Sequence, residues 1–167
     1  KGFVDITNAL LQRQSYADLY NSNGQTPLFL ASAAGHAEIT QILIRGGAKV
    51  NTTTHDKVSS LMIASVKGRL NVVKTLLQHG ADPNLLLPNG NTSIHLAAMK
   101  GHTAAVNELI LAGADSDAID TALLLAAQHG HTETTCLLLQ RGANVNKQSP
   151  HQNQSALHLA CLGGHKS

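Results

Sequence analysis

The stretch that decides the fold is TPLFLASAAGH, residues Thr26–His36. Its pattern is a hydroxyl residue, an apolar run with a central alanine, and a glycine followed by a basic residue. The same pattern returns as SSLMIASVKGR from Ser59, TSIHLAAMKGH from Thr92, TALLLAAQHGH from Thr121 and SALHLACLGGH from Ser155. The starting positions are 33, 33, 29 and 34 residues apart. A period of this length indicates a stack of repeats rather than a single globular core.

Each shared position has a local physical role. The hydroxyl residues can accept hydrogen bonds from free backbone N–H groups at a helix start. They are Thr26, Ser59, Thr92, Thr121 and Ser155. The glycines suit the left-handed conformation that ends a helix. Apolar residues downstream predict a second helix in each unit, packed through Leu43, Leu76, Leu109 and Leu138.

The pattern resembles the ankyrin repeat, a β-turn finger followed by two antiparallel helices. The resemblance covers essentially the whole chain, although only Thr26-Pro27 keeps the Thr-Pro pair and only His95 and His158 keep the motif histidine. It implies an all-α ankyrin-repeat solenoid, one array over residues 1–167. We predict a second helix alone in 1–20, repeats over 21–53, 54–86, 87–117 and 118–146, and a finger with a first helix over 147–167. The partial repeats favour a segment of a longer array.

Composition narrows the class of partner and the compartment. The formal net charge is +2, from 12 basic and 10 acidic residues that form no block, which argues against a nucleic-acid partner. No apolar run is long enough to predict direct membrane insertion. Cys136 and Cys161 are too few for a disulfide framework, so we expect an intracellular protein, cytoplasmic or nuclear.

Metal and catalytic chemistry are poorly supported. His158, Cys161 and His165 have zinc-like spacing, but each occupies a regular position of the repeat. Asp115, Asp117 and Asp120 lack the spacing and the final Glu of a calcium-binding loop. The glycines recur at the repeat period and form no phosphate-binding loop. We therefore predict no catalytic residue, no metal and no cofactor, and a protein that is not an enzyme.

The family resemblance implies a scaffold that binds a protein or peptide on the concave surface of fingers and first helices. The variable positions before the helix-ending glycines are Ala33, Ala34, Val66, Lys67, Met99, Lys100, Gln128 and His129. Those on the fingers include Asn23, Gln25, His55, Asp56, Val58, Leu86, Asn89 and Asn91. Alternatively, the array is a tether, spring or substrate receptor of a larger protein whose activity lies elsewhere, such as a channel, a ubiquitin-ligase adaptor, a kinase or a bacterial effector.

Two fingers depart from the pattern. Leu85, Leu86 and Leu87 enter the turn at Pro88, where we predict a strand with Leu86 on the opposite face from its neighbours. Leu86 with Met99 would then anchor an apolar side chain of the partner.

The fourth finger is too short for a hairpin. Thr92 lies eight positions after Asn84, but Thr121 lies only four positions after Asp117. This predicts a gap in the finger row, where Asp115, Asp117 and Asp120 could receive a basic side chain of the partner.

The resemblance also implies a modification, because ankyrin arrays are substrates of an oxygen-dependent asparaginyl hydroxylase. The candidate acceptors are Asn51, Asn84 and Asn146, each preceded by a leucine eight residues earlier, and Asp117 is an acidic variant. Alternatively, the asparagine side chain only stabilises the turn.

Overall fold

The structure is a computed structural model that describes residues 2–12, 16–150 and 152–164. These residues form ten helices separated by loops. The helices are α1 (Gly2–Gln12), α2 (Pro27–Ala34), α3 (Ala37–Arg45), α4 (Ser60–Val66), α5 (Leu70–Gln78), α6 (Ser93–Met99), α7 (Thr103–Leu111), α8 (Ser116–Gln128), α9 (Thr132–Gln140) and α10 (Ala156–Gly163).

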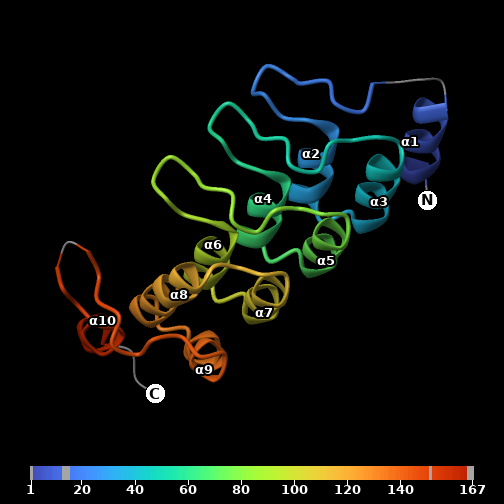
Figure 1. Cartoon of the computed structure of the whole chain (residues 1–167). Coiled ribbons are helices and arrows are strands. Elements are labelled where there is room, and N and C mark those ends of the chain that lie inside the picture. Colours follow the sequence, from blue (N-terminus) through green and yellow to red (C-terminus); the bar gives the residue numbers. More distant parts are fainter. Residues whose placement is uncertain (1, 13–15, 151, 165–167) are drawn as a thin grey trace.

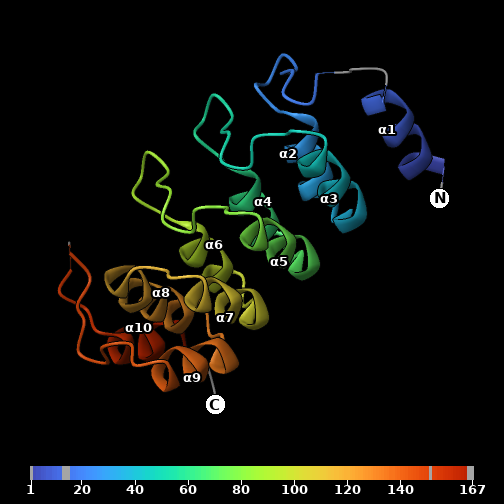
Figure 2. The same cartoon turned by 45° about the vertical axis from the view of Figure 1, so that its right-hand side comes forward.

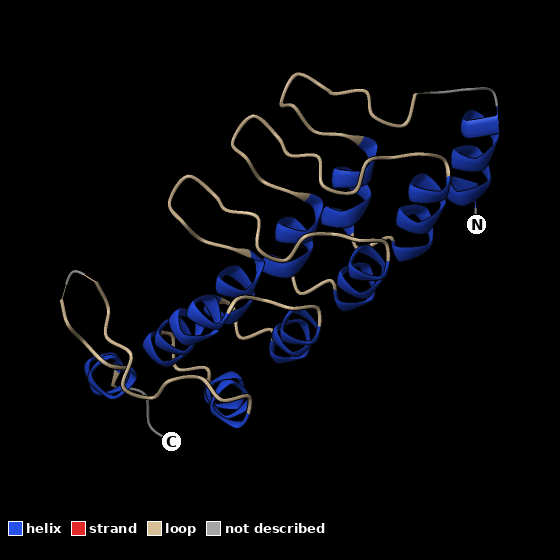
Figure 3. Ribbon diagram, in the orientation of Figure 1, coloured by secondary structure: helices blue, strands red, loops and turns tan. Residues whose placement is uncertain are grey.

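The helices stack in two rows (Figures 1 and 2). The first row contains α2, α4, α6, α8 and α10, and the second contains α1, α3, α5, α7 and α9. Long loops project from one side of the first row, as Figure 3 shows. Within the described ranges, strand pairing is limited to the isolated bridges Thr53–Ser59 and Gln148–Ser155. The expected all-α solenoid is therefore confirmed.

The start and end of α2 show how local sequence forms the first helices. The Thr26 hydroxyl accepts the N–H of Phe29 at 3.2 Å, and Pro27 occupies the first turn, where its missing N–H costs nothing. Gly35 ends the helix with φ 88°. A Cβ atom at Gly35 would lie 2.8 Å from Cδ of Arg69 in the next repeat. Glycine is therefore needed for both the helix end and the approach of the neighbouring repeat.

Leucine and isoleucine from both rows form the core, which runs through the stack. Each core side chain is at most 5% exposed: Leu28, Leu61, Ile94 and Leu123 from the first row, with Leu43, Leu76, Leu109 and Leu138 from the second. Burying each one stabilises the fold by roughly 1.5–3 kcal/mol. Ala64, Ala97 and Ala126 are completely buried, and their small size lets neighbouring helices approach closely.

The same repeat positions are exposed at the two ends of the described stack. Leu157 corresponds to Leu123 but is 74% exposed, and Leu10 corresponds to Leu43 but is 56% exposed. A repeat covers one apolar face of its neighbour, so burial of these positions requires a packing partner on each side.

The fourth repeat differs from its prediction. Thr121 does not cap the helix, because α8 begins five residues earlier, at Ser116, with Asp115 as its N-cap. The Thr121 hydroxyl instead donates to the carbonyl of Asp117 at 2.9 Å, inside the helix. The segment has no turn signal such as Gly24 in the first finger or Pro88 and Gly90 in the third, and Asp117 in the first turn suits the helix dipole. The predicted gap in the finger row is real, and the extended start of α8 lies in it (Figure 1).

The predicted strand over Leu85–Leu87 is wrong. These residues form an irregular loop segment, but their exposure still alternates as predicted. Leu86 is 62% exposed, whereas Leu85 and Leu87 are half-buried.

Candidate partner-binding surface

The first, second and third fingers, which lead into α2, α4 and α6, are closed by the same tight turn. The N–H of Gly24 donates to Asn21, that of Lys57 to Thr54, and that of Gly90 to Leu87, at 2.9–3.0 Å. The donor has a positive φ in each turn, 69°, 64° and 79°, respectively. Lys57 therefore adopts a left-handed conformation that glycine adopts in the other two fingers. The side chains that flank each turn project from the row of first helices.

The structure brings the predicted residues of the second finger together with those of the first. His55 and Asp56 are exposed and Val58 is half-buried. All three line a shallow hollow with Asn23 and Gln25. The rest of the lining is Ser22, Phe29 and Thr54. Polar finger side chains make up most of this lining, since Phe29 of α2 is only 8% exposed.

The predicted residues on the third finger and at the helix ends remain accessible to different extents. Asn89, Lys67, Lys100, Gln128 and His129 are exposed, while Asn91, Val66 and Met99 are half-buried. The His129 Nδ1 lies 2.9 Å from the carbonyl of Leu125, and its ring stacks on that of His131 with centroids 6.2 Å apart.

Histidines of the glycine–histidine pairs join consecutive repeats. The Nε2 of His102 lies 3.2 Å from the Val66 carbonyl, and the Nε2 of His131 lies 3.0 Å from the Met99 carbonyl. The His102 ring packs on Gly68, where a Cβ atom would lie 2.6 Å from the ring. These contacts fix the ends of α4 and α6 relative to the next repeat. They hold the helix-end residues of the candidate surface in register.

A second set of bonds between repeats uses asparagine. Asn51 donates from Nδ2 to the Gly80 carbonyl at 3.1 Å and accepts the N–H of Asp82 at 2.9 Å. Asn84 bonds the next loop in the same way, through the Gly113 carbonyl at 3.0 Å and the N–H of Asp115 at 3.0 Å. The asparagines therefore bridge to the following repeat rather than stabilise their own turn. Hydroxylation of Asn51, Asn84 and Asn146 stays a prediction.

The family model for ankyrin repeats in three copies matches three overlapping stretches, residues 1–87, 61–149 and 94–167. Together they span the chain. The chain belongs to the ankyrin repeat family. Ankyrin repeats are generally protein-interaction modules and are typically non-catalytic.

The predicted acidic gap of this ankyrin array is occupied by groups of the array itself. Lys147 forms an ion pair with Asp117, and the hydrogen bond that its ammonium donates to this carboxylate raises the pKa of Lys147. Asp120 accepts the N–H of Asn144 at 2.7 Å. A cation of a partner would therefore compete with Lys147 for Asp117.

Asp120 takes over the role of the bridging asparagine. Its bond to Asn144 is the counterpart of those that Asn51 and Asn84 make to the backbone of the next repeat. In the repeat pattern Asp117, the acidic variant, occupies the position of Asn51 and Asn84. Because α8 begins at Ser116, Asp120 rather than Asp117 makes this bond.

His95 is the buried polar residue that sequence reasoning treated only as a motif position. It is 5% exposed, and its Nδ1 accepts the N–H of Thr92 at 2.9 Å, which helps to start α6. Its Nε2 has no hydrogen-bond partner of normal geometry among the described residues, although the backbone of Ala118 in α8 lies beside it. Burial lowers the pKa of the imidazole, while Ala118 and the charge of Asp117 act in the opposite direction. We therefore expect a neutral His95 near pH 7.

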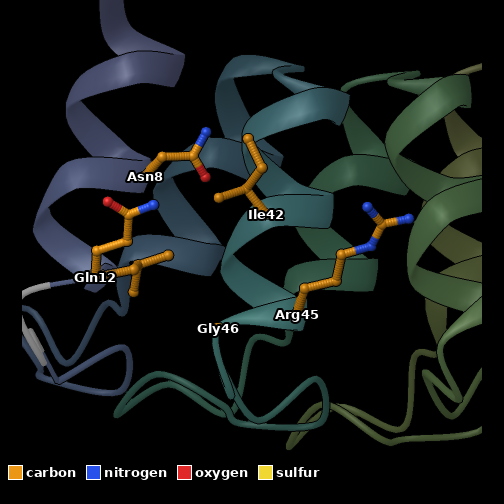
Figure 4. A pocket seen from close by; sticks show the side chains of 6 residues that line it. Asn8, Gln12, Ile42, Arg45 and Gly46 are labelled. Carbon is orange, nitrogen blue, oxygen red and sulfur yellow. The ribbon is translucent and has the colours of Figure 1, made fainter.

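Two other hollows lie outside the predicted surface. Figure 4 shows a hollow between α1 and α3, lined by Asn8, Gln12, Ile42, Arg45 and Gly46, together with Leu11. The other is apolar and lies along α10, lined by Gln154, Leu157, His158, Cys161 and Leu162. Both lie near the ends of the described stack, where apolar faces are exposed.

The described part of the chain contains no group of three or more His, Cys, Asp or Glu side chains that could hold a metal ion. The Nδ1 of His158 lies 2.8 Å from the Ser155 hydroxyl at the start of α10, as its repeat position predicts. His165 lies outside the described residues. No described helix is both long enough and apolar enough to cross a membrane.

Proposed function

We propose that this ankyrin array binds a segment of another protein on the surface formed by its fingers and first helices. One observation carries the proposal. Leu86 is 62% exposed where the chain enters the third finger, and Met99, at the end of the helix that follows this finger, is half-buried. We take this exposed leucine as an anchor for an apolar side chain of the partner, with Met99 as a second apolar contact.

The proposed surface consists of residues from three consecutive repeats, on the second and third fingers and at the ends of α4, α6 and α8. Its members are His55, Asp56, Val58, Val66, Lys67, Leu86, Asn89, Asn91, Met99, Lys100, Gln128 and His129. We leave Asp117 and Asp120 out, because Lys147 and the N–H of Asn144 already engage their carboxylates. A tether or substrate receptor within a larger protein would use the same surface. We also propose an intracellular location, cytoplasmic or nuclear, in keeping with two free, exposed cysteines.

The experiment begins with a random peptide library displayed on phage and selected on the whole chain. Affinities of the selected peptides are then measured by fluorescence anisotropy for Leu86→Ser and Met99→Ser. Leu111→Ser is the matched control, because Leu111 is 64% exposed but lies at the end of α7, in the other row.

We expect each of the first two substitutions to weaken binding about tenfold or more, since burying one leucine is worth roughly 1.5–3 kcal/mol. Leu111→Ser should leave the affinity unchanged. Thermal unfolding of each variant separates lost binding from lost structure. Peptides that bind all three variants and the parent chain equally would show that the proposed surface is not the binding site.

A further inference from the structure

The accessible face of α4 and α6 carries an apolar row and a basic row. In α4, residues Ser60, Leu61, Met62, Ala64 and Ser65 are all buried, so Ile63 and Val66 are its accessible members, followed by Lys67 at the helix end. The next repeat has Leu96, Met99 and Lys100 at the same positions. Each lysine follows its isoleucine or leucine by four residues and so lies on the same helix face. We call these six residues the basic strip.

The two lysines of the basic strip have no acidic partner. Both are exposed, and the ion pairs of the described residues are Lys74–Glu108 and Lys147–Asp117. No acidic residue occurs in α2, α4 or α6. The basic strip therefore presents uncompensated positive charge beside half-buried apolar side chains.

We infer that the basic strip binds an extended acidic segment of a protein partner, with apolar side chains on Ile63, Val66, Leu96 and Met99 and carboxylates at Lys67 and Lys100. The inference rests on the proposed function and specifies the chemistry of the ligand. The argument for an acidic ligand is charge complementarity. Lys67 and Lys100 are two cations without ion-pair partners at equivalent positions, and they favour a ligand with two carboxylates at the same separation.

The separation sets the spacing of the acidic residues. Neighbouring packed helices lie about 8–10 Å apart, so Lys67 and Lys100 recur at about this interval along the stack. A polyproline II segment rises about 3.1 Å per residue with three residues per turn, which returns every third side chain to the same side after about 9.3 Å. In a β-strand, by contrast, residues i and i+3 lie on opposite faces. The fitting ligand therefore carries an acidic residue at every third position, next to an apolar one.

Lysine at a helix end also interacts favourably with the helix dipole, which is a structural reason for its presence. That role affects the stability of α4 and α6 and has no effect on which peptide binds. Affinity and stability must therefore be measured on the same variants.

The test uses three labelled peptides and two double variants of the whole chain. One peptide repeats Glu-Leu-Pro, the second repeats Gln-Leu-Pro, and the third has the composition of the first in scrambled order. Lys67→Gln with Lys100→Gln removes the basic row. Arg45→Gln with Lys49→Gln removes the same charge from α3 and the loop after it, and serves as the control.

The Glu-Leu-Pro peptide should bind more tightly than the other two, and added salt should weaken its binding. Removing Lys67 and Lys100 should lower its affinity about five- to thirtyfold, because each exposed ion pair is worth up to about 1 kcal/mol. The control double variant should bind as the parent chain does, at unchanged thermal stability. Equal binding of the Glu and Gln peptides, equal losses in both double variants, or no measurable binding of the Glu peptide would overturn the inference.

The library-selected peptides distinguish this failure from failure of the proposed function. Selected peptides that depend on Leu86 and Met99, are not enriched in acidic residues and are indifferent to Lys67 and Lys100 would overturn the inference alone. Peptides indifferent to all four residues would overturn both.

Discussion

Replacing Asn84 by alanine tests whether the asparagine bridges hold the stack together. The substitution removes the bonds to the Gly113 carbonyl and to the N–H of Asp115, each 3.0 Å long. A typical intramolecular hydrogen bond contributes about 0.5–1.5 kcal/mol net, so the two together predict a loss of about 1–3 kcal/mol. Asp115 is the N-cap residue of α8, so the loss should concentrate where α8 begins.

Asn146→Ala is a close control, because Asn146 occupies the same repeat position but its side chain makes no hydrogen bond to the described residues. Its backbone N–H donates a hydrogen bond to the side-chain oxygen of Asn144 at 3.0 Å. We expect the control to change the unfolding free energy by less than about 0.5 kcal/mol, as most surface substitutions do. Asn51→Ala should resemble Asn84→Ala, since Asn51 makes the same pair of bonds.

Two measurements are needed because repeat arrays can unfold in parts. Chemical denaturation followed by helical circular dichroism gives the overall change. Hydrogen exchange of the Asp115 amide reports the bridge itself and should accelerate in Asn84→Ala. The reasoning is refuted if Asn84→Ala is no more destabilising than Asn146→Ala and the Asp115 amide exchanges as before.

Three further predictions concern pH, a finger turn and the ends of the stack. Burial lowers the pKa of folded His95 below its ordinary value of 6.5, so the unfolded chain binds the proton first. The stabilisation that follows from this difference in pKa is complete above about pH 6.5 and declines as the pH falls below it. Denaturation at several pH values should show a shallower decline of the unfolding free energy in His95→Met, because methionine binds no proton. Methionine is chosen because Met62 fills the same buried position in the preceding repeat. An equal decline in parent and variant would assign the pH dependence to other groups. Lys57→Gly should raise the unfolding free energy by about 1 kcal/mol, because a side chain at φ 64° is strained; a loss of stability would mean that the lysine side chain makes stabilising contacts. Amides of α1 and α10, which each pack against fewer neighbours, should exchange faster than those of α4 and α6, and uniform protection would contradict this.

The repeat pattern by itself determined the fold class and most of the helix starts. The hydroxyl cap at Thr26, the proline after it and the glycine at Gly35 act within about ten residues of one another, so the pattern predicts them without knowledge of the neighbours. The core leucines follow from the same pattern, since equivalent positions of stacked units meet equivalent partners. The finger and helix-end residues of the candidate surface were predicted from the same pattern, as its variable positions.

Only the tertiary structure decided where the repeats depart from one another. The extended start of α8 moved the bridging role from Asp117 to Asp120, and Lys147 reached Asp117 across 30 residues of sequence. Leu157 and Leu123 occupy the same repeat position, but one is 74% exposed and the other is fully buried. The physical reason is that capping and helix propensity act within one repeat, whereas burial, ion pairs and bridges depend on which groups the adjacent repeat places opposite.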